Sequence, residues 1–225
     1  MDNIFEKIGL YDFFGLLIPG MSFWIFIFYI DFPIIKEGIL PSSQTFRVIV
    51  FILMSYIIGT LIQEIASYYD NKCKMFNFRK KSREKFLNDN PLFEGEELKE
   101  VKELANRLLN KEKKNNSFSN NECSKMFFKC KSYLENHNKM GKANKLDAIF
   151  AMSRDFIVCN VCILGCLLGK IIIYTIFSIP LEWSFSYIAI IIYTILSSII
   201  FFRRAKRYSE LRTKTIIRQY INLKK

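Results

Sequence analysis

Basic and aromatic residues gather in one short stretch of the 225-residue chain, and their chemistry suits the binding of an anion. The basic residues are Arg79, Lys80, Lys81, Arg83 and Lys85, with phenylalanine at positions 76, 78 and 86. Aromatic rings beside cations suit stacking on nucleic-acid bases combined with neutralisation of phosphate. They suit equally a patch that rests on anionic lipid at a membrane surface. We favour the lipid interpretation and keep a nucleotide as the alternative ligand.

Three polar residues within or beside long apolar stretches are candidates for lining a pore or a cavity. Lys170 interrupts the apolar stretch 156–181, and Gln63 and Glu64 lie at the end of another. A charged side chain inside a membrane is costly and usually meets a partner or water. We therefore expect Lys170 to line a pore or cavity, or else to snorkel towards the outer interface. We expect Glu64 and Gln63 to form a ring at the inner mouth of an oligomeric channel, unless Glu64 is an ordinary interfacial residue.

Small residues recur along the second and third apolar stretches, and we expect them to mediate close helix packing. They are Ser55, Gly59, Cys162, Gly165, Cys166 and Gly169. Small side chains let helix backbones approach, so that dispersion replaces the hydrophobic drive that is missing in lipid. The GxxxG pattern at 165–169 predicts packing within the chain or between subunits. Pro19-Gly20 in the first stretch removes a helix hydrogen bond and is either a hinge or a plain kink.

Catalysis finds little support in the residue types. His137 is the only histidine, in an Asn-rich stretch, and no Gly-rich phosphate loop or HExxH pattern occurs. Six cysteines are too sparse for a disulfide scaffold, and the CxxC spacing 159–162 lies inside an apolar stretch, where we interpret it as packing. We therefore expect no enzyme, no cofactor and no metal site. The 22 Phe and 11 Tyr argue against disorder.

Four long stretches without a charge, apart from Lys170, must position these residues: 13–30, 48–63, 156–181 and 183–202. A helix needs about 20 mostly apolar residues to span a bilayer. We predict an all-α membrane protein with four transmembrane helices and a small helical domain inserted between the second and the third. The alternative is a soluble protein with buried core helices. The segments are 1–69 (an interfacial N-terminal helix and two spans), 70–155 (the helical domain), 156–202 (a transmembrane hairpin) and 203–225 (a basic tail).

Charge predicts the orientation. Residues 71–155 carry 20 Lys/Arg and 12 Asp/Glu, and residues 203–225 carry 9 and 1, so each segment has a net charge of +8. Segments rich in Lys and Arg stay in the cytoplasm. We therefore expect both termini to be cytoplasmic.

The inserted segment has its own helix signals. Ser119 and Glu122 match a capping box, in which each side chain meets a free backbone N–H of the first turn. Apolar residues follow with a period near 3.6, as in an amphipathic helix.

The opening Tyr11–Gly20 (YDFFGLLIPG) resembles the start of small multi-pass bacterial antiphage-defence membrane effectors of the Hailong or CBASS-like transmembrane type. The resemblance implies a homo-oligomer that permeabilises the bacterial inner membrane when a nucleotide or oligonucleotide signal changes. It also implies a cytosolic nucleotidyltransferase partner that makes the signal. No ligand residue carries over from that family.

Two functions follow. The first is an oligomeric, ion-conducting or membrane-disrupting effector, gated through its basic cytosolic domain by an anionic nucleotide or oligonucleotide in antiphage defence. The alternative is a membrane-anchored binding or scaffold protein that recruits a cytosolic partner without transport.

Overall fold

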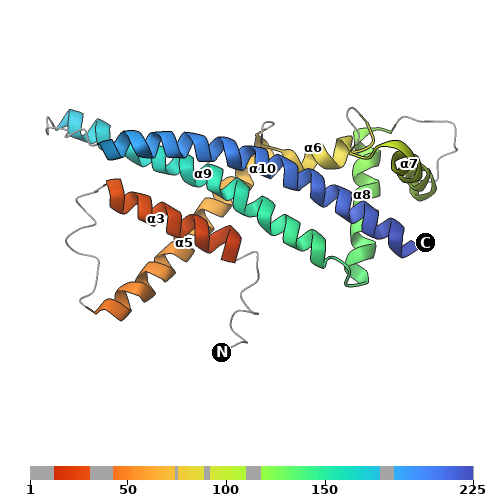
Figure 1. Cartoon of the computed structure of the whole chain (residues 1–225), viewed down its shortest axis with the longest axis horizontal. Coiled ribbons are helices and arrows are strands. Elements are labelled where there is room, and N and C mark those ends of the chain that lie inside the picture. The colour runs from red at the N-terminus through yellow and green to blue at the C-terminus, as the bar shows by residue number, and fades with distance from the viewer. Residues whose placement is uncertain are drawn as a thin grey trace. The chain divides into compact units, whose positions relative to one another are not determined.

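The structure is a computed structural model that describes residues 13–30, 43–73, 76–88, 92–109, 118–177 and 185–224. Within these ranges every regular element is a helix and no strand occurs, which confirms the all-α prediction (Figure 1). The elements are η1 (Phe13–Leu17), α3 (Ile18–Ile30), α5 (Gln44–Lys72), α6 (Phe78–Lys85), α7 (Gly95–Leu109), α8 (Asn120–Asn136), α9 (Gly141–Ile176) and α10 (Phe185–Lys224). The predicted N-terminal interfacial helix lies outside the described residues.

The chain divides into two compact units. The membrane unit comprises Met1–Tyr68 and Ala148–Ala205, and the basic unit comprises Tyr69–Asp147 and Lys206–Lys225. The basic unit contains 26 of the 33 Lys/Arg and 13 of the 21 Asp/Glu, a net charge of +13. Helices α5, α9 and α10 contribute residues to both units.

Among the residues that the structure describes, three helices are long and apolar enough to cross a membrane, which indicates a membrane protein. They are Gln44–Lys72, Gly141–Ile176 and Tyr187–Lys224, and the first predicted span forms a shorter apolar helix at Gly15–Phe28. Large apolar side chains remain exposed on the three long helices, including Leu61, Ile176 and Ile200. Such faces are costly in water and natural in lipid.

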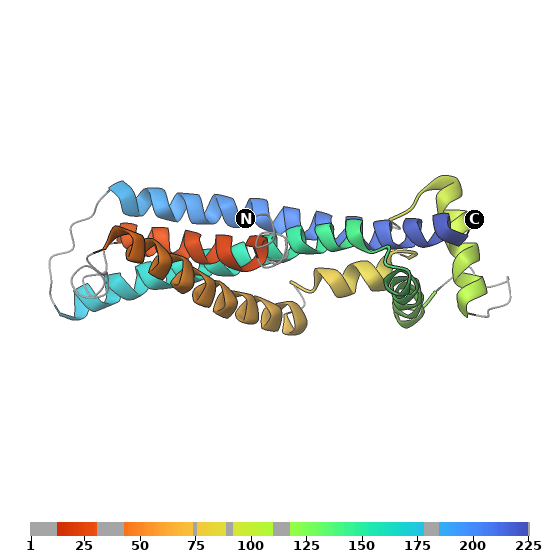
Figure 2. The ribbon, with the colours of Figure 1, turned by 90° about the horizontal axis from the view of Figure 1, so that it is seen from below.

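In the membrane unit, α3 and α5 pack with almost no space between their backbones (Figure 2). A Cβ added to Gly20 would lie 1.8 Å from the carbonyl oxygen of Ser55, and one added to Gly59 would lie 2.0 Å from that of Leu16. Only glycine fits at such separations. The predicted packing residues Ser55 and Gly59 therefore lie at the contact with η1 and α3, together with Gly20.

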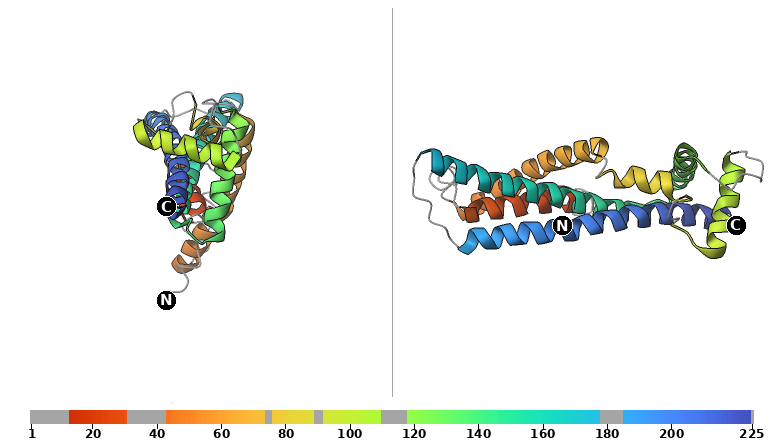
Figure 3. Two further views of the ribbon diagram at one scale, coloured as in Figure 1. Left: turned by 90° about the vertical axis from the view of Figure 1, so that its right-hand side faces the viewer. Right: turned by 90° about the horizontal axis from the view of Figure 1, so that it is seen from above.

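The basic unit has its own apolar core, built from α7, α8 and the C-terminal part of α10 (Figure 3). The capping box at Ser119 and Glu122 is confirmed at the start of α8. Residues 203–224, most of the predicted basic tail 203–225, belong to α10, and Ile216 and Ile217 are fully buried in this core. The apolar residues in that segment recur at helical spacing, and this pattern could have predicted an amphipathic helix that packs on a core.

Candidate functional site

Helix α6 separates the predicted basic cluster into two groups. Lys80, Lys81 and Lys85 are exposed to solvent, whereas Arg79 and Arg83 are half-buried beside the buried face of the helix. The cause is the 3.6-residue period, which directs Phe78 and Ser82 inward. The five residues therefore do not form one continuous basic surface.

One carboxylate joins two of the inward arginines. Asp147 on α9 forms ion pairs with both, its Oδ1 lying 2.9 Å from Arg79 Nη2 and its Oδ2 lying 3.3 Å from Arg212 Nη2. These three residues, which we call the Asp147 clamp, come from α6, α9 and α10. The Arg212 side chain is only 10% exposed, so water screens its pair with Asp147 far less than it screens a surface pair. Arg212 also lies over the ring of Phe127, 5.8 Å from its centroid.

Three hydroxyl groups next to the clamp fasten α6 to α10. Ser82 Oγ lies 3.0 Å from Ser209 Oγ and 2.9 Å from Thr213 Oγ1, and all three side chains are buried. Buried hydroxyl groups need such partners because an unpaired one costs about 1–3 kcal/mol. The sequence stretch 79–85 therefore has a structural role in addition to its charge.

Arg83 holds a different position. Its Nε donates to the carbonyl oxygen of Arg79 (3.1 Å), and its guanidinium lies over the ring of Phe128, 5.0 Å from the centroid. Burial lowers the pKa of Arg83, and the charge of Arg79 lowers it further, while Glu84 and Asp70 raise it. The group stays cationic at neutral pH because an arginine begins from a very high pKa.

Lys170 lies inside the membrane unit, 5% exposed. Its ammonium donates to the carbonyl oxygen of Ile30 (2.6 Å) and to the hydroxyl of Tyr187 (2.8 Å). It also lies 5.3 and 5.1 Å from the ring centroids of Tyr174 and Tyr187. Ile30 is the last residue of α3, where helix carbonyls lack partners and the helix dipole favours a cation. These internal contacts hold the ammonium between helices.

Further polar groups in the membrane unit were not predicted. Arg154 Nε donates to Asp155 Oδ1 (2.9 Å) in a pair whose side chains are almost fully buried. Asn160 Nδ2 donates to Ser197 Oγ at 2.7 Å, so an amide joins α9 to α10 within their apolar parts. Arg154 and Asp155 are adjacent in sequence beside a charged segment, which made them resemble surface residues. Asn160 lies inside an uncharged apolar stretch, and this alone could have predicted that its amide has a hydrogen-bond partner on another helix.

The remaining predicted residues lie on open faces or at the α3 contact. Glu64 is exposed and Gln63 half-buried on α5. An added Cβ at Gly165 or Gly169 meets no atom within 4 Å among the described residues, so the described chain does not pack on this pair. Cys162 and Cys166 beside them are half-buried.

Pro19 and Gly20 lie within the first turn of α3, directly after the π-helix η1. The Pro19 carbonyl accepts a hydrogen bond from Cys159 Sγ (3.4 Å). The Pro-Gly pair is thus held by neighbours on both α5 and α9.

In the described part of the chain, no three His, Cys, Asp or Glu residues lie close enough together to bind one metal ion. No protein-family profile, curated protein or solved structure matches this chain.

Proposed function

We propose that the chain is a four-span membrane effector that assembles into an ion-conducting oligomer and is gated by an anionic nucleotide or oligonucleotide at its basic unit. The Asp147 clamp is the observation that carries this proposal. Asp147 is the residue at which α9 leaves the basic unit, and the next residue belongs to the membrane unit. A ligand that competes for Arg79 or Arg212 would release α9 from α6 and α10.

Two features of the membrane unit support assembly and conduction. The open Gly165–Gly169 face of α9 offers a close contact to a second copy of the chain. Buried Lys170, with Glu64 at the other end of the apolar region, provides charges that could act on permeating ions. The excess of basic residues in 71–155 and 203–225 supports cytoplasmic termini in a bacterial inner membrane. The YDFFGLLIPG resemblance supports antiphage defence as the setting.

The alternative is a membrane-anchored binding protein that recruits a cytosolic partner. The internal contacts of Lys170 with Ile30 and Tyr187 favour it, because they satisfy the buried charge without a water-filled pore. In this case the exposed lysines of α6 would rest on anionic lipid.

Planar-bilayer recording of the purified full chain tests the proposal. We expect channel-like conductance whose open probability changes when mononucleotides or short oligonucleotides are added on the side of the basic unit. A bilayer that stays sealed with every ligand, together with a stoichiometric partner in membrane extracts, would establish the anchored alternative.

A further inference from the structure

The carboxylate of the Asp147 clamp is an incomplete partner for the two arginines that it joins. Two cations, Arg79 and Arg212, share this one carboxylate. Its Oδ1 is buried and, within the described residues, accepts no hydrogen bond, although Arg79 Nη2 lies 2.9 Å away. Arginine binds an anion most strongly through two parallel hydrogen bonds. The clamp therefore attracts by charge without the geometry of a strong arginine pair.

Arg212 is the most deeply buried cation of the clamp, and one of its donors is unused. The whole residue is 8% exposed, and its Nε has no hydrogen-bond acceptor in the part of the chain that the structure describes. Burial lowers the pKa of Arg212, Asp147 raises it, and the charges of Arg79 and Arg83 lower it again. A buried donor without an acceptor costs about 1–3 kcal/mol. An anion with more acceptor oxygens than a carboxylate would therefore suit this position better.

Hydroxyl groups border the clamp on both helices. Ser82 follows Arg79 by three residues on α6, and Ser209 and Thr213 flank Arg212 on α10. Ser82 Oγ lies 3.0 Å from Ser209 Oγ and 2.9 Å from Thr213 Oγ1, so α6 and α10 stay joined here without the carboxylate. Guanidinium and hydroxyl groups together are common phosphate donors in proteins.

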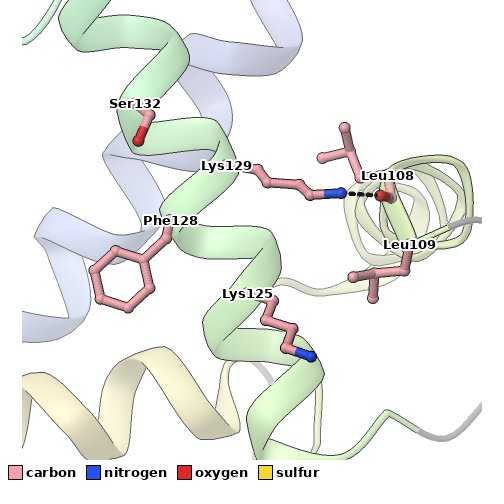
Figure 4. Close-up of a pocket in the computed structure, with 6 residues that line it drawn as sticks. All are labelled: Leu108, Leu109, Lys125, Phe128, Lys129 and Ser132. Atoms are coloured by element: carbon pink, nitrogen blue, oxygen red, sulfur yellow. Dashed lines mark hydrogen bonds between the residues drawn. The ribbon is translucent and has the colours of Figure 1, made fainter.

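The clamp is accessible from solvent, since the side chains of Arg79 and Asp147 are 28% and 25% exposed. The hollow between α7 and α8 is a weaker candidate for an anion. Its Lys129 already donates to the carbonyl oxygen of Leu108, and Phe128 points to the other side of α8 (Figure 4). Of these two places in the basic unit, the clamp is thus the one with an unmet buried donor.

We propose that Asp147 occupies a phosphate site, from which a phosphomonoester displaces it to bind Arg79 and Arg212. Asp147 is then an internal competitor that keeps the site closed without ligand. A phosphomonoester has three terminal oxygens and a charge of about −1.5 to −2 at neutral pH, so it offers these arginines more acceptors and more charge than a carboxylate. The inference rests on the proposed function and names the chemical group that its ligand presents.

Titration calorimetry of the full chain in neutral phosphatidylcholine nanodiscs tests the site, with AMP, inorganic phosphate and adenosine as probes. We expect AMP and phosphate to bind and adenosine not to bind. Arg212→Gln should weaken AMP binding at least about tenfold, which corresponds to about 1.4 kcal/mol. Asp147→Asn should instead tighten it about tenfold, because a competitor that fills the site about nine-tenths of the time lowers the apparent affinity by that factor.

Arg107→Gln and Glu103→Gln are the matched controls, because they make the same changes of charge at exposed positions of α7 outside the clamp. Both should leave the AMP affinity unchanged. A further measurement needs no variant to fold: in the unmodified chain, AMP should protect Arg79 from the arginine reagent phenylglyoxal, while Arg107 stays reactive.

Nanodiscs with phosphatidic acid distinguish a lipid headgroup from a soluble ligand as the source of the phosphate. If the headgroup fills the site, phosphatidic acid should weaken AMP binding more than phosphatidylglycerol does at equal surface charge. If a soluble ligand fills it, the two lipids should act alike.

Three results would overturn the site: neither AMP nor phosphate binds at low salt, Asp147→Asn binds AMP no more tightly than Glu103→Gln, or Arg212→Gln binds AMP as the unmodified chain does. Bilayer recording separates the two proposals. Nucleotide gating that Arg212→Gln leaves unchanged would retain the effector and remove the phosphate site. AMP binding with the expected variant effects, in a bilayer that stays sealed, would retain the site and remove the effector.

Discussion

The backbone of Gly20 lies so close to the Ser55 carbonyl oxygen that a β-carbon would approach it to 1.8 Å. One turn further along α5, Gly59 has the same relationship to Leu16, at 2.0 Å. In both cases the neighbouring atom belongs to a backbone, which cannot turn aside as a side chain can. The junction of η1, α3 and α5 is thus fixed by two positions that have no side chain.

Gly20→Ala and Gly59→Ala should each destabilise the membrane unit by about 1–3 kcal/mol, the usual cost of overpacking. Thermal unfolding of the purified protein in detergent measures the loss. Gly165→Ala is the matched control, because a Cβ there meets nothing within 4 Å in the described chain. Equal stability of all three variants would contradict the close contact.

Gly165→Leu combined with Gly169→Leu should leave each subunit folded and shift the oligomer towards monomer. The described chain does not cover this face, so added bulk would obstruct only a neighbouring copy. Native mass spectrometry in detergent measures the oligomeric state. If the variant assembles as the unmodified chain does, subunits meet elsewhere.

Lys170→Met should lower stability by about 1–3 kcal/mol, because the Ile30 carbonyl would lose its donor in an apolar setting. The same variant should alter ion selectivity in bilayer recordings if Lys170 faces the conduction path. If stability falls and ion selectivity does not change, the role of Lys170 is structural: it holds the end of α3 in place. Glu64→Gln, at an exposed position, serves as the comparison for stability.

Asp147→Asn should loosen α6, because the neutral amide no longer attracts Arg79 and Arg212 and leaves two cations close together. Amide hydrogen exchange in α6 should become faster, and the open probability of the channel should rise without ligand. Glu103→Gln removes a carboxylate whose ion pair lies within one helix, with Arg107, and should alter neither. Unchanged exchange in the Asp147 variant would show that the hydroxyl contacts of Ser82 suffice.

Cys130 should resist a charged thiol reagent, because burial raises its pKa to about 12 and leaves almost no thiolate near neutral pH. Raising the pH to about 9 keeps the thiol protonated, so labelling should require unfolding. Cys73 is half-exposed and should react in the folded protein, and Cys73→Ser should remove that fast phase. Fast labelling of Cys130 in the native state would mean that the core around α8 opens readily.

Local sequence patterns predicted much of the helical architecture. They could not predict contacts between residues that are far apart in the sequence. Ser119 and Glu122 lie within one turn, so their types and spacing defined the start of α8. Asp147 and Arg212 are ordinary surface residue types, and nothing in their surroundings relates one to the other. The division of the Arg79–Lys85 cluster followed from helical periodicity and could have been predicted. The contact between the end of α7 and α8, where Lys129 Nζ donates to the carbonyl oxygen of Leu108, joins residues 21 positions apart and has no local sequence signal.

Helix α10 comprises 40 residues and contains neither glycine nor proline. At a rise of 1.5 Å per residue it extends roughly 60 Å, about twice the hydrocarbon thickness of a bilayer. Sharp kinks in long helices usually arise at proline, at glycine or at a π-bulge, and α10 has neither proline nor glycine. One continuous helix therefore carries both Tyr187, which bonds Lys170, and Arg212, which pairs with Asp147.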